Sequence, residues 1–249
     1  ALAGGYDVKE FFVEMGIPVT DSINLEAGAR FADYSTGNDT DAFKIGAYWQ
    51  VNEELSVRGT LQNATRHGNI TELYRGQGAS LTDLDPDPCG TDPETGIAPS
   101  YTAAQCANTG LPADLYGGDL KSPADQYNIL TGGNPNLVPE ESESTTIGVV
   151  WTPGSVPGLT VTLDYFDILI EDKIGTIPAS TSLTNCLESG NPTFCSLIER
   201  DPIAGTLWVS PGQIITTNTN VAEESLNGFD LIFDYNLDTK LGPLNIKGV

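Results

Sequence analysis

The sequence predicts an all-β fold, an antiparallel β-barrel whose strands cross an outer membrane and carry long external loops. Three observations support this prediction. First, every odd-numbered residue in 23–31 is apolar, whereas the even-numbered positions carry Asn24, Glu26, Gly28 and Arg30. Second, the alternating segments are about ten residues long, as membrane-crossing strands are. Third, short and very long connections alternate along the chain, as they do in outer-membrane barrels.

Two hairpins open the predicted barrel. We place their strands at about 6–18, 22–35, 41–51 and from residue 55 onward, joined by short segments rich in Gly, Asn, Asp and Pro. Four apolar side chains of the first strand share the face that we expect to contact lipid: Phe11, Val13, Met15 and Ile17.

Alternation resumes in the second half of the chain. We expect strands at about 145–151, 159–170 and 224–237, and the beginning of a further strand at 244–246. This makes about seven or eight strands, whose two outer edges would be unpaired. Because unpaired strand edges are too costly in lipid, we expect other strands to complete the barrel.

Two long inserts interrupt the alternation, at about 66–140 and 172–223. The first is rich in Gly, Pro, Asp, Asn and Ser, and we expect no regular secondary structure in it. Within the second, residues 182–200 are compatible with short helical turns. Because outer-membrane barrels have short periplasmic turns and long outer loops, we assign both inserts to the extracellular side.

Four cysteines lie in the inserts as two local pairs, Cys89 with Cys106 and Cys186 with Cys195. Four cysteines allow three pairings, and we favour the two between near neighbours, as loop disulfides of an oxidising compartment. A zinc site is the alternative, but the spacing is not that of a zinc motif and His67 is the single histidine. We therefore expect no metal and no cofactor.

Composition argues against several classes of protein. A formal charge of −23 with only 11 basic residues makes nucleic acid a poor partner. No apolar run reaches the length of about 18 residues that a membrane helix needs. The first residues contain no basic segment followed by an apolar stretch, so we expect the chain to begin inside a longer precursor or to be a fragment.

Basic residues of the polar strand face are candidates for contact with an anionic ligand: Arg30, Lys44, Arg58 and Arg66. Acidic residues are alternative partners for them: Glu26, Asp164, Asp230 and Asp234. Aromatic residues of the inserts are candidates for stacking on a ligand, or for packing inside the loops: Tyr74, Tyr101, Tyr116, Tyr127 and Trp208. From these sets we select as ligand-binding candidates Arg30, Arg58, Arg66, Tyr101, Tyr116 and Trp208.

The sequence offers no arrangement typical of catalysis. Asp83, Asp85 and Asp87 provide carboxylates for a calcium ion, but the EF-hand pattern is absent and a solvated acidic loop is the simpler interpretation. Neighbours such as Glu140 and Glu141 would point to opposite faces of one strand, which prevents a glycosidase pair. Because nucleophile motifs, phosphate loops and dinucleotide fingerprints are also missing, we expect no catalytic residues and no enzymatic activity.

Two segments carry a family resemblance. Residues 134–140 read Asn-Pro-Asn-Leu-Val-Pro-Glu and lead into a predicted strand, and residues 64–74 lie upstream. They resemble the N-P-x-L-x-P-E signature and the A-x-R-A-P-x-x-x-E-L-F segment of TonB-dependent outer-membrane receptors, and the resemblance covers essentially the whole chain. Gly68 stands where the second motif has its proline. The matching positions are Arg66, Glu72, Leu73, Asn134, Pro135, Leu137, Pro139 and Glu140.

The resemblance implies that residues 1–249 form part of the barrel domain, the later portion of a roughly 22-stranded transmembrane barrel, without the plug domain or TonB box. It implies uptake of a bulky nutrient such as a siderophore, a cobalamin or an oligosaccharide, with energy delivered by TonB through the plug. The implied partners are outer-membrane lipid, TonB, the remaining strands of the same receptor and a small-molecule or oligosaccharide ligand. The implied location is the cell outer membrane of a Gram-negative bacterium.

Two other kinds of protein would show the same alternation. One is a passive outer-membrane porin or channel, and the other is a secreted soluble β-sandwich that binds a ligand. An upstream plug domain would distinguish the receptor from the channel. Solubility without detergent would identify the sandwich.

Overall fold

The computed structural model describes residues 2–240 and 242–249, except for the side chain of residue 222. The chain forms two compact units. The strand unit comprises residues 6–68, 138–173 and 222–249, and the loop unit comprises residues 2–5, 69–137 and 174–221.

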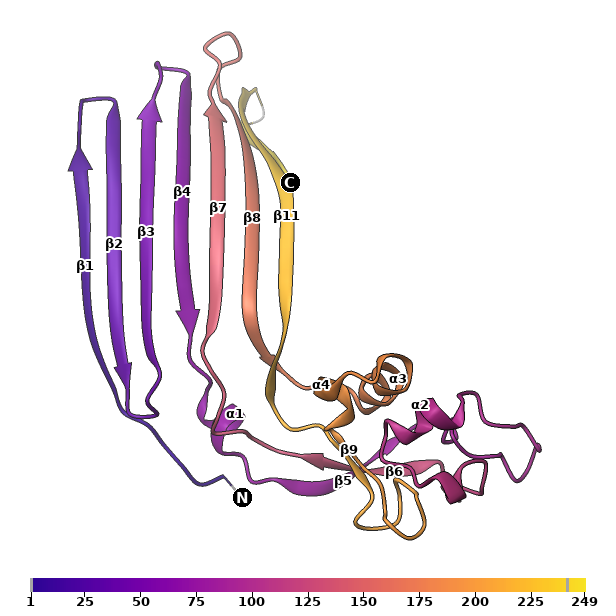
Figure 1. Cartoon of the computed structure of the whole chain (residues 1–249). Helices are drawn as coiled ribbons and strands as arrows, with labels where there is room; N and C mark the ends of the chain where they lie inside the picture. The colour runs from indigo at the N-terminus through magenta and orange to yellow at the C-terminus, as the bar shows by residue number, and fades with distance from the viewer. Residues whose placement is uncertain (1, 241) are drawn as a thin grey trace. The chain divides into compact units, whose positions relative to one another are not determined.

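The strand unit contains one eight-stranded sheet in the order β1-β2-β3-β4-β7-β8-β11-β12 (Figure 1). The strands that run through it are β1 (Val8–Pro18), β2 (Ile23–Tyr34), β3 (Asp39–Gln50), β4 (Leu55–Arg66), β7 (Glu140–Trp151), β8 (Leu159–Gly175), β11 (Thr219–Thr239) and β12 (Gly242–Gly248). Neighbouring strands pair in antiparallel register, for example β1 with β2 and β7 with β8. The all-β prediction and the predicted order of hairpins are therefore confirmed.

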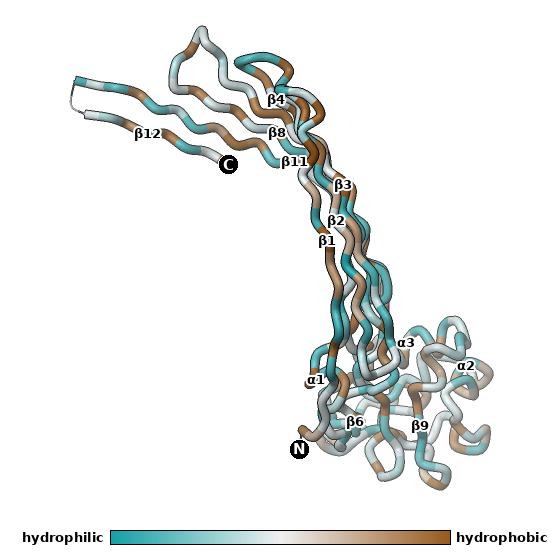
Figure 2. The backbone as a smooth tube through the Cα atoms, turned by 90° about the vertical axis from the view of Figure 1, so that its left-hand side faces the viewer, coloured by the Kyte–Doolittle hydropathy of each residue, from teal (hydrophilic) through white to brown (hydrophobic). Residues whose placement is uncertain are grey.

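The register places apolar residues of neighbouring strands on one face of the sheet. Ile45 lies opposite Leu61, and Val149 lies opposite Leu163. Apolar and polar residues alternate along the strands (Figure 2). Exposed side chains on the apolar face include Phe11, Val13, Met15, Ile17, Phe31, Phe43, Ile45 and Leu163. The four side chains predicted for one face of the first strand therefore do share an exposed face, and no other described element of the strand unit covers it.

Two strands are longer than the sequence predicts. β8 has 17 residues and β11 has 21, whereas the hydropathy pattern indicated only residues 159–170 and 224–237. The added segments contain charged and polar residues, and Lys173 of β8 forms an ion pair with Glu224 of β11. Backbone pairing therefore continues past the point where hydrophobic alternation ends.

The loop unit is folded, so the expectation that residues 66–140 lack regular structure is wrong. Its sheet has the order β5-β6-β10-β9 and combines strands from both inserts. Its elements are α1 (Ile70–Tyr74), β5 (Gly78–Asp83), α2 (Ala103–Ala107), a 3₁₀ turn (Ala113–Leu115), β6 (Gln126–Thr131), α3 (Ala179–Ser189), α4 (Pro192–Cys195), β9 (Ile198–Glu199) and β10 (Gln213–Ile215). The helices in 182–200 confirm the predicted helical turns.

Local capping and distant packing explain this order. Asn69 and Glu72 form a capping box at the start of α1, and Thr102 and Gln105 form another at α2. Such short helices are unstable alone, so they depend on the surrounding packing.

No helix in residues 2–240 or 242–249 is long and apolar enough to cross a membrane.

Candidate functional site

The polar face of the strand unit carries cross-strand ion pairs. Arg30 pairs with Glu10, and the Lys44 ammonium lies 2.8 Å from a Glu26 carboxylate oxygen. The side chains of Arg30 and Lys44 remain about half exposed, at 49% and 46%. Such exposed pairs contribute little to stability. Arg30, a predicted ligand contact, therefore already has a carboxylate partner.

Arg58, the second predicted contact, reaches Asp164 across an intervening strand. Its Nη2 donates to Asp164 Oδ2 at 2.8 Å and to Oδ1 at 2.9 Å. Gly148 of β7 lies opposite both residues in the register. A Cβ atom at Gly148 would come within 1.9 Å of Asp164 Oδ1, so a side chain at this position would displace the Asp164 carboxylate from its present contact with Arg58. The alternative partners Glu26 and Asp164 are therefore confirmed for Lys44 and Arg58.

Arg66 pairs with Glu140, directly opposite in the register of β4 and β7. Nε and Nη2 of Arg66 each donate to a Glu140 carboxylate oxygen at 2.6 Å. Both residues belong to the family motifs, which lie far apart in the sequence, and the structure joins them in a bidentate pair. The two positions are recognisable from the sequence motifs, but their contact follows only from the register of β4 and β7.

The core of the loop unit is largely apolar and crosslinked by disulfides. Cys89 with Cys106 and Cys186 with Cys195 form disulfides, as predicted, and no free cysteine remains. Three of these cysteines are fully buried beside side chains such as Leu120, Leu187, Leu207 and Ile214. Burial also raises the pKa of the Tyr127 phenol, whose oxygen accepts the backbone N–H of Asp87 at 3.2 Å.

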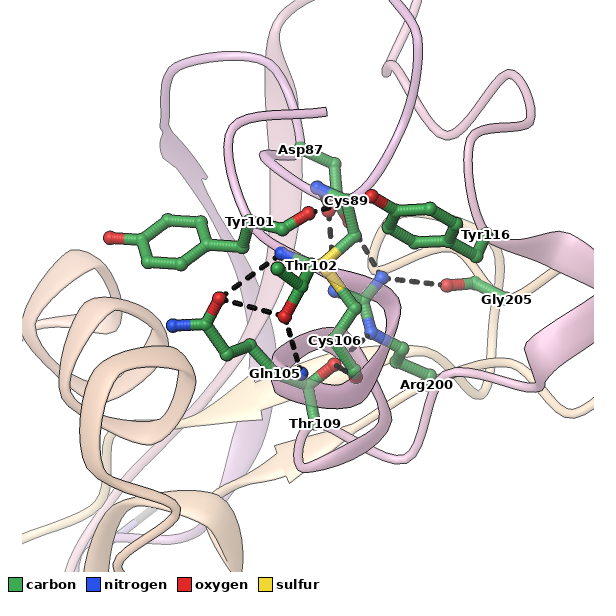
Figure 3. Close-up of a disulfide and its surroundings, with 10 residues drawn as sticks. All are labelled: Asp87, Cys89, Tyr101, Thr102, Gln105, Cys106, Thr109, Tyr116, Arg200 and Gly205. Atoms are coloured by element: carbon green, nitrogen blue, oxygen red, sulfur yellow. Dashed lines mark hydrogen bonds and ion pairs between the residues drawn. A yellow bond between two sulfur atoms is a disulfide. The ribbon is translucent and has the colours of Figure 1, made fainter. Parts of the chain in front are cut away.

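A buried arginine joins the two inserts (Figure 3). Arg200 Nη1 donates to Asp87 Oδ2 at 2.6 Å and to the Gly205 carbonyl at 2.8 Å, and its Nε donates to Thr109 Oγ1 at 2.7 Å. The two charged side chains are 1% and 0% exposed. Asp87 also accepts the N–H of Cys89 at 3.0 Å. Asp87 is therefore a structural carboxylate inside the loop unit, not the solvated acid that the sequence suggested.

The predicted aromatic contacts Tyr101, Tyr116 and Trp208 pack against the core of the loop unit. The Tyr116 hydroxyl donates to the Tyr101 carbonyl at 2.8 Å, and Trp208 Nε1 donates to the Leu120 carbonyl at 3.3 Å. These rings are partly buried, so each has an internal role and retains some exposed surface. Tyr127, by contrast, is 1% exposed.

Other residues of the two motifs hydrogen-bond or pack inside the loop unit. The Asn134 N–H donates to the Glu72 carbonyl at 2.9 Å, and the Asn134 side chain donates to the Asn218 carbonyl at 3.0 Å. Leu73 and Leu137 are buried, at 1% and 2% exposure. These positions therefore shape the backbone, while Pro135 and Pro139 lie in the same stretch leading to β7.

The single histidine packs within the strand unit. His67 stacks on the Tyr34 ring with centroids 4.1 Å apart, and its Nε2 lies 2.8 Å from Thr36 Oγ1. Among the described residues, no group of three or more His, Cys, Asp and Glu side chains is arranged to hold a metal ion.

Comparison with models of known protein families gives a match that covers nearly the whole chain. The family model "TonB dependent receptor-like, beta-barrel" matches residues 2–247. A comparison with curated protein sequences gave no match.

Several solved structures share the fold at low sequence identity. The siderophore receptor PirA from Pseudomonas aeruginosa is 16% identical with a TM-score of 0.54, over 92% of this chain and 31% of that one. PirA from Acinetobacter baumannii is 17% identical with a TM-score of 0.55, over 96% and 27%. A mutant ferric enterobactin receptor, PfeA from Pseudomonas aeruginosa in complex with enterobactin, is 14% identical with a TM-score of 0.56, over 93% and 25%. The chain thus spans between a quarter and a third of these structures.

Proposed function

Because the chain belongs to the TonB-dependent receptor β-barrel family, we propose that it is part of an outer-membrane receptor that imports a bulky nutrient with TonB-coupled energy. The nutrient is a siderophore, a cobalamin or an oligosaccharide. The match over residues 2–247 carries the proposal, and the continuous apolar strand face supports it. The receptor acts as a transporter and not as an enzyme.

In this proposal the apolar face contacts outer-membrane lipid and the polar face lines the barrel interior. The remaining strands of the receptor pair with the edges that β1 and β12 present. Residues 66–140 and 172–223 lie outside the cell, and a plug domain elsewhere in the receptor engages TonB. The ligand contacts remain those proposed from the sequence: Arg30, Arg58, Arg66, Tyr101, Tyr116 and Trp208.

Uptake measurements test energy coupling. Cells that express the complete receptor should accumulate its nutrient, and deletion of TonB should abolish accumulation while leaving surface binding intact. A passive channel would continue to admit the nutrient without TonB. Unchanged uptake in the deletion strain would therefore overturn the proposal.

A further inference from the structure

The loop unit contains a cavity of about 620 Å³, a volume within the usual range for small-molecule sites. Its wall comes from α1, β5, β6, the start of α3 and the chain after β10. Both inserts therefore build it. Polar and apolar side chains both line it, which suits a ligand that has polar groups as well as C–H surface.

Hydroxyl groups make up most of the polar wall. They belong to Thr71, Thr82, Thr131, Thr176, Ser180 and Thr216. Two of them are held in place by the backbone: the Thr131 hydroxyl donates to the Gly78 carbonyl at 3.4 Å, and the Thr216 hydroxyl donates to the Leu130 carbonyl at 3.2 Å. A hydroxyl that donates one bond still has acceptor capacity. The wall can therefore accept hydrogen bonds from a ligand at fixed positions.

The charged groups of the cavity are nearly balanced. Arg75 lines it and forms no ion pair with any residue that the structure describes, and Asp83 lies in the same wall. Glu72 also contributes, but its Oε2 accepts the Asn69 N–H at 2.8 Å in the capping box. A guanidinium and a carboxylate can each bind two neighbouring hydroxyls of a ligand, as donor and as acceptor respectively.

The loop unit as a whole is strongly acidic. Its basic residues are Arg75, Lys121 and Arg200, of which Lys121 and Arg200 already pair with carboxylates. Its acidic residues are Glu72, Asp83, Asp85, Asp87, Asp92, Glu94, Asp114, Asp119, Asp125, Glu188, Glu199 and Asp201. The field of such a surface lowers the local concentration of anions. A neutral ligand is not subject to this repulsion.

We propose that this cavity binds a neutral, polyhydroxylated ligand, namely a saccharide unit of the imported nutrient. The inference rests on the proposed function and narrows it from three nutrient classes to one. Fixed hydroxyls, Arg75 and Asp83 hydrogen-bond the sugar hydroxyls. The aliphatic side chains of Leu84, Ile129 and Ile177 contact its C–H faces.

Calorimetry on the complete purified receptor in detergent tests this inference. The probes are maltotriose, cellotriose and xylotriose as neutral ligands, and ferric enterobactin as an anionic one. At least one trisaccharide should bind, and Arg75→Gln and Thr82→Val should each weaken it about tenfold, the size expected for a lost hydrogen bond to a charged or buried group. Thr184→Val is the matched control, because Thr184 is exposed on α3 outside the cavity.

The outcomes separate the site from the energy coupling. Binding of a trisaccharide that both cavity variants weaken, with the control unchanged and the circular dichroism of every variant intact, supports the inference. Failure of all three trisaccharides to bind, or binding that the cavity variants leave unchanged, overturns it. Ferric enterobactin binding that depends on Arg75 also overturns it but leaves the receptor proposal standing. Loss of TonB dependence in uptake overturns only the proposed transport function.

Discussion

The two units of the chain use apolar residues in opposite ways. In the loop unit, side chains such as Leu73, Leu120 and Leu207 are almost fully buried, whereas Ala32 and Pro153 are the only buried apolar side chains of the strand unit among the described residues. The apolar face of the strand unit instead exposes large side chains, with Phe11 at 67% and Phe229 at 71%. An exposed apolar surface of this extent needs a covering other than water. We therefore expect the loop unit to lie in water and the apolar face of the strand unit to contact lipid.

Ion pairs show the same contrast. The Arg200–Asp87 pair is buried and both of its side chains form further hydrogen bonds, while the Arg58 side chain of the strand unit is 55% exposed. A buried charge that loses its partner is strongly destabilising, whereas an exposed pair contributes little. Loss of the buried pair should therefore lower the free energy of unfolding more than loss of the exposed pair, although both join an arginine to an aspartate.

The largest expected effect comes from Asp87→Asn, which leaves the Arg200 guanidinium buried without its counter-charge. The loop unit should lose about 3–5 kcal/mol of stability, measured as faster hydrogen exchange of β6 amides in the intact receptor. Asp164→Asn is the matched substitution in the exposed pair and should cost at most about 1 kcal/mol. Equal losses would contradict the difference between the units.

A charge on the apolar strand face should be the next most damaging change. Leu163→Arg should lower the free energy of unfolding in lipid vesicles by up to about 2–4 kcal/mol, because a charge on the lipid face of a strand is costly, most of all at the bilayer midplane. Thr162→Arg places the same side chain on the opposite face and should have little effect. Guanidinium titrations of both variants provide the comparison. Tolerance of Leu163→Arg would indicate that this face contacts water.

A smaller effect is expected at Gly148, where an added methyl group would displace Asp164 from Arg58. Gly148→Ala should cost about 1 kcal/mol or less by the same titration, since the pair is exposed. Gly16→Ala is the control, because a Cβ at Gly16 meets no atom within 4 Å. In an Asp164→Ala background the cost of Gly148→Ala should disappear, and its persistence would argue against the ion pair as the cause.

The smallest effect concerns pH in the loop unit. The N–H of Glu94 and the Thr95 hydroxyl hold the pKa of the Asp92 carboxyl below its usual range. A lowered folded-state pKa stabilises the turn above the unfolded pKa, and this contribution is lost as pH falls through the lowered value. Exchange of the Gly96 amide, corrected for intrinsic rates, should therefore stay slow through the usual aspartate range. Asp92→Ala should lose that protection at every pH, and a loss in the wild type at an ordinary aspartate pKa would refute this account.

The strands of the strand unit could be predicted from the sequence because the alternation that defines them involves only residues close together in the chain. A period of two determines which residues share a face, so Ile45 and Leu163 could be assigned to the apolar side without knowledge of their neighbours. The ion pairs were only partly predictable. Lys44–Glu26 and Arg58–Asp164 were among the expected partners, but Arg66–Glu140 depends on the register of strands that are 74 residues apart.

The contacts that hold the loop unit together could not be predicted in this way. Arg200 and Asp87 are 113 positions apart, and no periodic pattern connects them. The one usable signal was that Arg200 is the only basic residue within 174–221, a segment that also contains Cys186 and Cys195. The cavity likewise arises from packing between the two inserts, so its wall residues carry no contiguous motif.

Nitroxide labels along β3 test most directly that lipid covers the apolar face. Single cysteine substitutions at Phe43, Ile45 and Ala47 would report on one face, and those at Lys44, Tyr48 and Gln50 on the other. In the complete receptor in bilayers, the first set should be relaxed mainly by dissolved oxygen and the second mainly by a water-soluble nickel complex. If the first set were instead shielded from both, a protein layer would cover that face and the membrane assignment would be wrong.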